Sequence, residues 1–239
     1  MELTPMQKQY MEIKAQYPQE ILFFRLGDFY EMFFEDAVVV SRELGLTLTS
    51  RSGDVNKNSM CGVPYHAVDG YLAKLVSKGY RVAIAEQIGD PKAKGLTQRQ
   101  VVKVVTPGTI LEESALKSAQ NNYIALIYQS PDALVLAGAD ISTGECFYGI
   151  YQGNDSLQAL CDELYRLMLP EILLLGQLTQ RQELEKFVHL RLEHCIFTEI
   201  SEPAKEIDNL IVQHFDINNR PEKGPAEIAV ATLLEYLHN

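Results

Sequence analysis

The chain has 239 residues, which exceeds the usual size of one domain and leaves room for two domains, each with its own core. Apolar residues make up 46% of the sequence and charged residues 22%, as in globular proteins, and no run of about 18 apolar residues predicts a membrane-spanning helix. The net charge of −11 is uneven: residues 1–115 carry 13 basic against 14 acidic residues and residues 116–239 carry 8 against 18, which argues against nucleic-acid binding by the second half.

The first residues and the cysteines indicate the cellular compartment. The start of the chain lacks the basic flank and the apolar stretch of a signal peptide, and the four cysteines are scattered without a Cys-x-x-Cys pair. We therefore expect a cytoplasmic protein with reduced cysteines in its core, rather than a disulfide framework or a zinc site.

The chain opens with a predicted helix and a predicted β-hairpin. Residues 4–17 are expected to form a short helix, and two apolar runs at 21–26 and 29–34 are expected to be strands. Gly27 and Asp28 separate the two runs, and this pair is a two-residue turn signal.

Phe29 follows this turn directly and therefore lies at the tip of the predicted hairpin. Because side chains alternate along a strand, Phe29 and Glu31 are expected to project from one face and Tyr30 from the other. A ring and a carboxylate that project together could stack on a nucleobase and hydrogen-bond its edge. The alternative is that Phe29 packs back onto its own sheet, since aromatic side chains are mostly buried.

Alternation of helices and strands continues through the first half. Asp36 is expected to cap a helix that ends at Leu44 before Gly45, and residues 46–49 are expected to form a strand. An amphipathic helix is expected to end at Gly79. The remaining predicted features are a polar loop at 51–59, strands at 80–86 and 100–105, and a turn at 106–109.

Basic residues gather near the end of the first half. Residues 74–103 hold seven Lys or Arg against Glu86 and Asp90, a local net charge of +5. Contacts to DNA phosphates require such a cluster, although an ordinary solvated face is the alternative.

The second half begins with three β-like runs at 122–129, 133–140 and 145–151. Helices at 157–167 and 180–187 then alternate with extended segments at 171–175 and 194–199, and a last helix is expected at 225–237. Three antiparallel strands followed by α/β alternation resemble a ribonuclease H-like fold.

This fold invites a nuclease hypothesis. Asp140 ends one predicted strand and Glu145 begins the next, and paired carboxylates hold the two metals of such enzymes. Catalysis nevertheless needs three or four converging acids, and a fold does not determine chemistry, so we expect no catalytic site and no metal site.

Four sequence blocks occur in the order and near the spacing of the MutS family of DNA mismatch repair proteins, which this chain resembles over most of its length. The blocks are residues 27–33 (GDFYEMF), 60–68 (MCGVPYHAV), 82–91 (VAIAEQIGDP) and 104–109 (VVTPGT), with a weaker match at 139–145 (ADISTGE).

The resemblance implies the domain organisation. We expect a mixed-sheet α/β mismatch-recognition domain at 1–115, a ribonuclease H-like α/β connector domain at 116–221, and the start of a truncated core helix at 222–239. In the family a Phe-x-Glu motif reads the mismatch, and it corresponds here to Phe29 and Glu31. Arg51, Arg99 and Lys103 are the candidates for contacts to DNA phosphates.

The expected mechanism is recognition without catalysis. Phe29 would enter the minor groove and stack on a mispaired base, because an imperfect pair costs less to unstack than a Watson–Crick pair. Glu31 would hydrogen-bond the displaced base, as a charged acceptor for a thymine N3–H or as a protonated donor to a purine N7. Surrounding phosphates would favour the protonated form.

The resemblance also implies partners. These are mismatched duplex DNA, the repair protein MutL through the connector domain, and a second copy in a homodimer of the full-length parent. No Gly-x-x-x-x-Gly-Lys-Ser/Thr motif is present, so ATP and Mg²⁺ are expected only in a missing C-terminal ATPase domain. The competing hypotheses are a protein-interaction module and a ribonuclease H-like nuclease.

Overall fold

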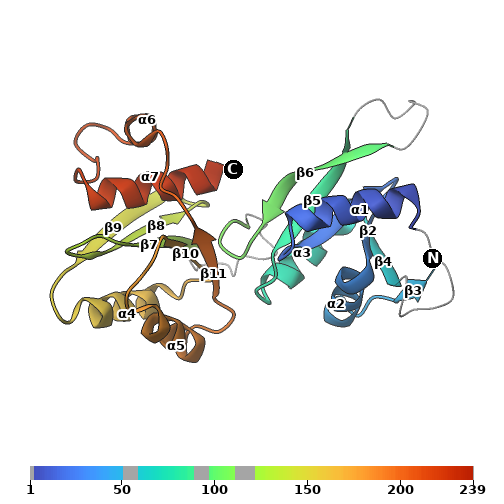
Figure 1. Ribbon diagram of the computed structural model, residues 1–239, viewed down its shortest axis with the longest axis horizontal. Coiled ribbons are helices and arrows are strands. Elements are labelled where there is room, and N and C mark those ends of the chain that lie inside the picture. Colours follow the sequence, from blue (N-terminus) through green and yellow to red (C-terminus); the bar gives the residue numbers. More distant parts are fainter. Residues whose placement is uncertain (1–2, 51–58, 89–96, 111–121, 239) are drawn as a thin grey trace. The chain divides into compact units, whose positions relative to one another are not determined.

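Figure 1 shows a computed structural model of the chain, which describes residues 3–50, 59–88, 97–110 and 122–238. The described residues divide into two compact α/β units, the first ending at Thr106 and the second beginning at Pro107. No helix within these described ranges is long and apolar enough to cross a membrane.

The first unit is built on a mixed sheet of six strands in the order β3-β4-β2-β1-β5-β6. The strands are β1 (Ile21–Leu26), β2 (Phe29–Phe33), β3 (Thr49–Ser50), β4 (Ser59–Pro64), β5 (Val82–Ile88) and β6 (Gln98–Val105). β1 pairs antiparallel with β2 and parallel with β5, so the hairpin lies at the centre of the sheet. The predicted mixed-sheet α/β class is therefore confirmed.

Helices cover both faces of this sheet (Figure 1). On one face, Tyr10 and Ile13 of α1 (Pro5–Gln16) pack on Leu22 and Phe24 of β1. Thr4 begins α1 with a capping box to Gln7. Side chains of β1 that alternate with Leu22 and Phe24 are buried on the other face, where α2 (Phe34–Leu44), the short helix η1 (Tyr65–Ala67) and α3 (Val68–Val76) lie.

The junction between β2 and α2 differs from the sequence prediction. β2 ends at Phe33, and Phe34 begins the helix with a φ of +54°, a left-handed conformation that turns the chain sharply. Asp36 was predicted to cap this helix but is buried within its first turn. Its carboxylate accepts hydrogen bonds from the Tyr10 hydroxyl at 2.7 Å and the Leu22 backbone N–H at 3.0 Å, so it joins helices to the sheet instead.

The expected strand at 46–49 is also shorter and displaced. Exposure alternates over residues 46–50 as predicted, but ladder pairing to β4 is made only by Thr49 and Ser50. β4 itself was not predicted. Residues 51–58 of the predicted polar loop lie outside the described residues.

The second unit holds a five-stranded sheet in the order β11-β10-β7-β8-β9. The strands are β7 (Tyr123–Gln129), β8 (Leu134–Asp140), β9 (Glu145–Tyr151), β10 (Glu171–Leu175) and β11 (Ile196–Ile200). β7, β8 and β9 are antiparallel, whereas β7, β10 and β11 are parallel. The predicted order of three antiparallel strands followed by α/β alternation is confirmed.

Two helices cover each face of this sheet. α4 (Ser156–Leu167) and α5 (Arg181–Arg191) pack on one face, and α6 (Ile207–His214) and α7 (Pro225–His238) pack on the other. α6 was not predicted from the sequence. Residues 222–239 were assigned to a separate helix, yet α7 contributes Ala229, Val230 and Leu233 to the core of this unit.

Candidate nucleic-acid interface

Phe29 occupies an exposed position at the tip of the β1–β2 hairpin. Gly27 has a φ of +58°, which a glycine adopts without strain, and Leu26 and Phe29 form the last register pair before the turn. Phe29 is 45% exposed, whereas Tyr30, its neighbour on the other face of the strand, is 5% exposed. Nearly half of the Phe29 surface is therefore accessible to a partner.

Glu31 lies on the same face of β2 as Phe29, because the register with β4 is regular from Phe29 to Phe33. The half-buried Glu31 is flanked by Phe24 on β1 and Gly62 on β4. A Cβ at Gly62 would lie 3.4 Å from the Glu31 Cγ and 3.2 Å from the Tyr30 carbonyl oxygen. Gly62 therefore leaves room for the Glu31 side chain on this face of the sheet.

Tyr30 faces the opposite side of the sheet, as the alternation predicted. Its ring lies 6.1 Å from that of Phe23, centroid to centroid, and its hydroxyl donates a hydrogen bond to Glu86 on β5. Burial, together with the hydrogen bond and the negative charge of Glu86, raises the pKa of Tyr30 to about 12. Tyr30 is therefore a neutral structural residue that anchors the strand between Phe29 and Glu31.

Two further residues contact the hairpin turn, and sequence reasoning missed both. The Arg25 Nε donates to the Gly27 carbonyl oxygen at 2.5 Å, and the Tyr65 backbone N–H donates to the Asp28 carbonyl oxygen at 2.9 Å. The Arg25 guanidinium also lies 4.0 Å from the centroid of the Tyr65 ring. The sequence feature that could have indicated a role for Arg25 is its position as the charged residue in the otherwise apolar strand sequence ILFFRL.

Arg99 was a candidate for a phosphate contact, and the structure corrects this role. Only 8% of the residue is exposed. Its guanidinium donates to the Arg25 carbonyl oxygen at 2.5 Å, the Thr97 carbonyl oxygen at 2.7 Å and the Gln9 Oε1 at 3.0 Å, and it lies over the Phe24 ring. Burial also lowers its pKa. Arg99 is thus a structural residue on the face of the sheet that α1 covers.

The structure describes only part of the predicted basic cluster, and these residues lie at different places in the first unit. Lys103 is exposed on β6 opposite Ile84, and Arg51 lies outside the described residues. Lys78 forms an ion pair with Glu43 at 2.9 Å. Arg81 accepts a backbone hydrogen bond from Ile21 at the start of β1, the end of the strand opposite to the turn.

The acids of the second unit do not converge. Asp140 and Glu145 are register partners, but the Asp140 carboxylate is buried and accepts from the Asn122 and Ser142 backbone N–H groups at 3.1 and 2.8 Å. Glu145 accepts from the Tyr123 hydroxyl at 2.7 Å. Over the described ranges, no group of three His, Cys, Asp or Glu residues could hold a metal ion.

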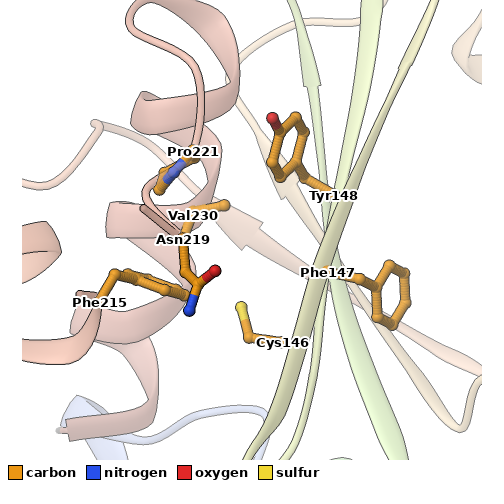
Figure 2. Close-up of a pocket in the computed structure, with 7 residues that line it drawn as sticks. All are labelled: Cys146, Phe147, Tyr148, Phe215, Asn219, Pro221 and Val230. Carbon is orange, nitrogen blue, oxygen red and sulfur yellow. The ribbon is translucent and has the colours of Figure 1, made fainter. Parts of the chain in front are cut away.

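A pocket of about 170 Å³ lies between β9 and the segment that joins α6 to α7 (Figure 2). Cys146 and Tyr148 point toward this pocket from β9, whereas Phe147 points to the other side of the strand. Burial raises the pKa of the Cys146 thiol to about 11, so the thiol is protonated at neutral pH. The pocket therefore presents no activated nucleophile.

Comparison with known families covers nearly the whole chain. A family model described as MutS domain I matches residues 4–114, and one described as MutS domain II matches residues 122–239.

Curated relatives named DNA mismatch repair protein MutS are also similar to this chain. The relative from Desulforamulus reducens is 42% identical over 247 residues, which cover 100% of this chain and 28% of the relative. The relative from Syntrophomonas wolfei is 43% identical over 90% of this chain and 25% of its own length. The relative from Pelotomaculum thermopropionicum is 52% identical over 70% of this chain and 20% of its own length. The chain thus spans a quarter or so of the length of these relatives.

Proposed function

Because the chain belongs to the MutS family of DNA mismatch repair proteins, we propose that its first unit binds mismatched duplex DNA and that Phe29 and Glu31 read the mismatch. The observation that carries this proposal is the exposed Phe29 ring at a hairpin tip, on the same face as a half-buried carboxylate. Single exposed apolar side chains are common on protein surfaces, so the support comes from the combination of the ring, the carboxylate on the same face and the family membership.

Phe29 acts as a wedge in the minor groove. Insertion of an apolar ring between base steps unstacks them and kinks the duplex, at a cost of a few kcal/mol per step. A mismatched pair is already weakly stacked and paired, so this cost is lower there than in a matched duplex. The difference in deformation energy is the recognition signal.

Glu31 supplies the polar contact to the displaced base. Its carboxylate lies two residues from Phe29 on the same strand face, within reach of the edge of a base that stacks on the ring. Charged, it accepts a hydrogen bond from a thymine N3–H; protonated, it donates to a purine N7.

Other parts of the protein complete the proposed role. Lys103 and Arg51 contact DNA phosphates, which strengthens binding without reading sequence. The acidic second unit contacts MutL. The full-length parent forms a homodimer in the cytoplasm, and its C-terminal ATPase domain binds ATP and Mg²⁺.

The test is the affinity of the full-length protein for a G·T-mismatched and a matched duplex, measured by fluorescence anisotropy at low salt. Phe29→Ala should lower the mismatch-to-match affinity ratio by about tenfold, as the loss of 1–3 kcal/mol of base stacking implies. It should change the free energy of unfolding by less than about 1 kcal/mol, because the ring is exposed.

Val38→Ala is the matched control, because Val38 is also 45% exposed but lies on α2. This variant should keep the affinity ratio of the wild type. An unchanged affinity ratio in Phe29→Ala would contradict the stacking role. A loss of about 3 to 5 kcal/mol in unfolding free energy, which is typical when a core aromatic residue is removed, would instead support the alternative that Phe29 packs on its own sheet.

A further inference from the structure

Both carbonyl oxygens of the two-residue turn next to Phe29 are held by hydrogen bonds from outside the turn. The Arg25 Nε binds the Gly27 oxygen at 2.5 Å, and the Tyr65 backbone N–H binds the Asp28 oxygen at 2.9 Å. The two donors belong to different elements, β1 and η1. Two different neighbouring elements therefore hold the turn by hydrogen bonds.

Arg25 also connects these two anchors to each other. Its guanidinium lies over the Tyr65 ring at 4.0 Å and over the Tyr30 ring at 5.4 Å, and its Nη1 lies 4.0 Å from the Glu86 carboxylate. The Arg25 side chain is only 17% exposed, so its charge faces rings and a carboxylate rather than solvent. A planar guanidinium can stack on a ring and donate in its own plane at once, which an ammonium cannot do.

We propose that Arg25 is a positioning residue that fixes the Gly27-Asp28 turn and thereby the direction in which Phe29 projects; this inference rests on the proposed function. Arg25 is the register partner of Tyr30 and therefore lies on the face of the sheet opposite to Phe29. It acts through the turn, with the Tyr65 ring as the surface against which it is held.

The physical reason is preorganisation. A wedge that is already fixed in its binding conformation loses little conformational entropy when it enters DNA. A loosely held tip would lose more on insertion, and it could also swing away from a stiff matched duplex instead of paying the cost of unstacking it. A rigid tip therefore raises mismatch affinity and discrimination together.

The experiment compares Arg25→Ala and Arg25→Lys with wild type in the full-length protein, using anisotropy with G·T-mismatched and matched duplexes across a salt series. Arg25→Ala should lower the mismatch-to-match affinity ratio by about tenfold. Arg25→Lys, which keeps the charge and a donor but lacks the planar stack, should rescue only part of the loss. The salt slope should stay at the wild-type value, because Arg25 makes no phosphate contact.

Arg42→Ala is the control for charge, because Arg42 lies on α2 with a 68% exposed side chain and forms an ion pair with Glu43. It should keep the wild-type ratio. Tyr65→Leu provides a second test, because Tyr65 is 44% exposed and the substitution removes the stack on Arg25 while leaving the backbone hydrogen bond to Asp28. In a double-mutant cycle, the effects of Tyr65→Leu and Arg25→Ala on the affinity ratio should be less than additive.

Amide hydrogen exchange of residues 27–29 in the DNA-free protein tests, independently of binding, whether Arg25 fixes the turn. This exchange should be faster in Arg25→Ala. If wild type discriminates between the duplexes but Arg25→Ala has the same affinity ratio or the same exchange rates, the positioning role is overturned and the proposed function still stands. A salt slope lowered by about one for both duplexes would make Arg25 a phosphate contact instead. A wild type without discrimination would overturn the proposed function itself.

Discussion

At the scale of single residues, the charge of Glu31 is what separates recognition from simple DNA affinity. A carboxylate close to phosphates disfavours ordinary duplex by repulsion, and only a displaced base in hydrogen-bonding position compensates for that cost. Gly62 keeps space beside Glu31, so an isosteric substitution fits without repacking.

Glu31→Gln should therefore raise the affinity for matched duplex more than that for mismatched duplex. We expect the affinity ratio to fall about fivefold, which corresponds to about 1 kcal/mol. Anisotropy titrations with both duplexes measure this ratio. A variant that weakens both duplexes equally would make Glu31 a structural residue.

The fate of Arg99 shows why charge alone does not identify a phosphate contact. In sequence, Arg99 and Lys103 are equivalent members of a basic cluster, yet Arg99 is buried and Lys103 is exposed. Arg99 pairs with Gln87 in register and lies on the face covered by α1, where Gln9 accepts its hydrogen bond. A register shift between Ile84 and Ala85 separates the two positions, and no local pattern predicts such a bulge.

At the scale of elements, Asp36 holds α1, β1 and α2 together. Its buried carboxylate accepts from Tyr10, from the Leu22 N–H and, at 2.8 Å, from the Lys14 Nζ. Every one of these partners is a donor, so the site is built for an acceptor with two free oxygens.

Asp36→Asn should lower the free energy of unfolding by about 3 kcal/mol, because the amide nitrogen would face a donor and Lys14 would lose its counter-charge. Urea unfolding measures this value. Glu12→Gln on the exposed side of α1 is the control and should stay within about 0.5 kcal/mol of wild type. An equal and small effect in both variants would mean that the Asp36 contacts contribute nothing net.

The same elements show how far sequence patterns reach. The hairpin and β7, β8 and β10 were predicted almost residue for residue, because short apolar runs between clear turn signals specify strands. β4 was missed because Cys61, Gly62 and Pro64 have weak strand propensity, and its pairing with β2 supplies the missing preference. Arg25 and Tyr65 at the turn were missed because their contact joins residues forty positions apart in sequence.

At the scale of the whole molecule, the two units have different chemical characters. The first carries the exposed aromatic tip, whereas the second has a ribonuclease H-like strand order without converging acids in its described part. Asp140, one of the two acids on which the nuclease hypothesis rests, instead accepts a hydrogen bond from the Asn122 backbone N–H before β7. Fold and chemistry are thus separate in this unit.

A second buried acid of this unit, Glu171, ties together distant parts of the chain. The residue is 0% exposed at the start of β10. Its carboxylate accepts from the Gly108 backbone N–H at 3.1 Å, the Thr198 hydroxyl at 2.6 Å and the Tyr236 hydroxyl at 3.0 Å. Gly108 lies two residues after Thr106, where the first unit ends, and Tyr236 lies on α7. The Glu171 carboxylate therefore holds both the first residues of the second unit and α7.

Glu171→Gln should lower the unfolding free energy of the second unit by about 3 kcal/mol, because three donors converge on the carboxylate and an amide nitrogen would leave at least one of them unsatisfied in the core. Amide hydrogen exchange should become faster around Gly108 and along α7, while exchange in β1 and β2 of the first unit keeps its wild-type rate. Glu163→Gln, at a surface ion pair with Arg166 on α4, is the matched control and should change stability by less than about 1 kcal/mol. If exchange in both units rose together, the two units would unfold as one cooperative body, and Glu171 would stabilise the whole chain rather than the connection at Gly108.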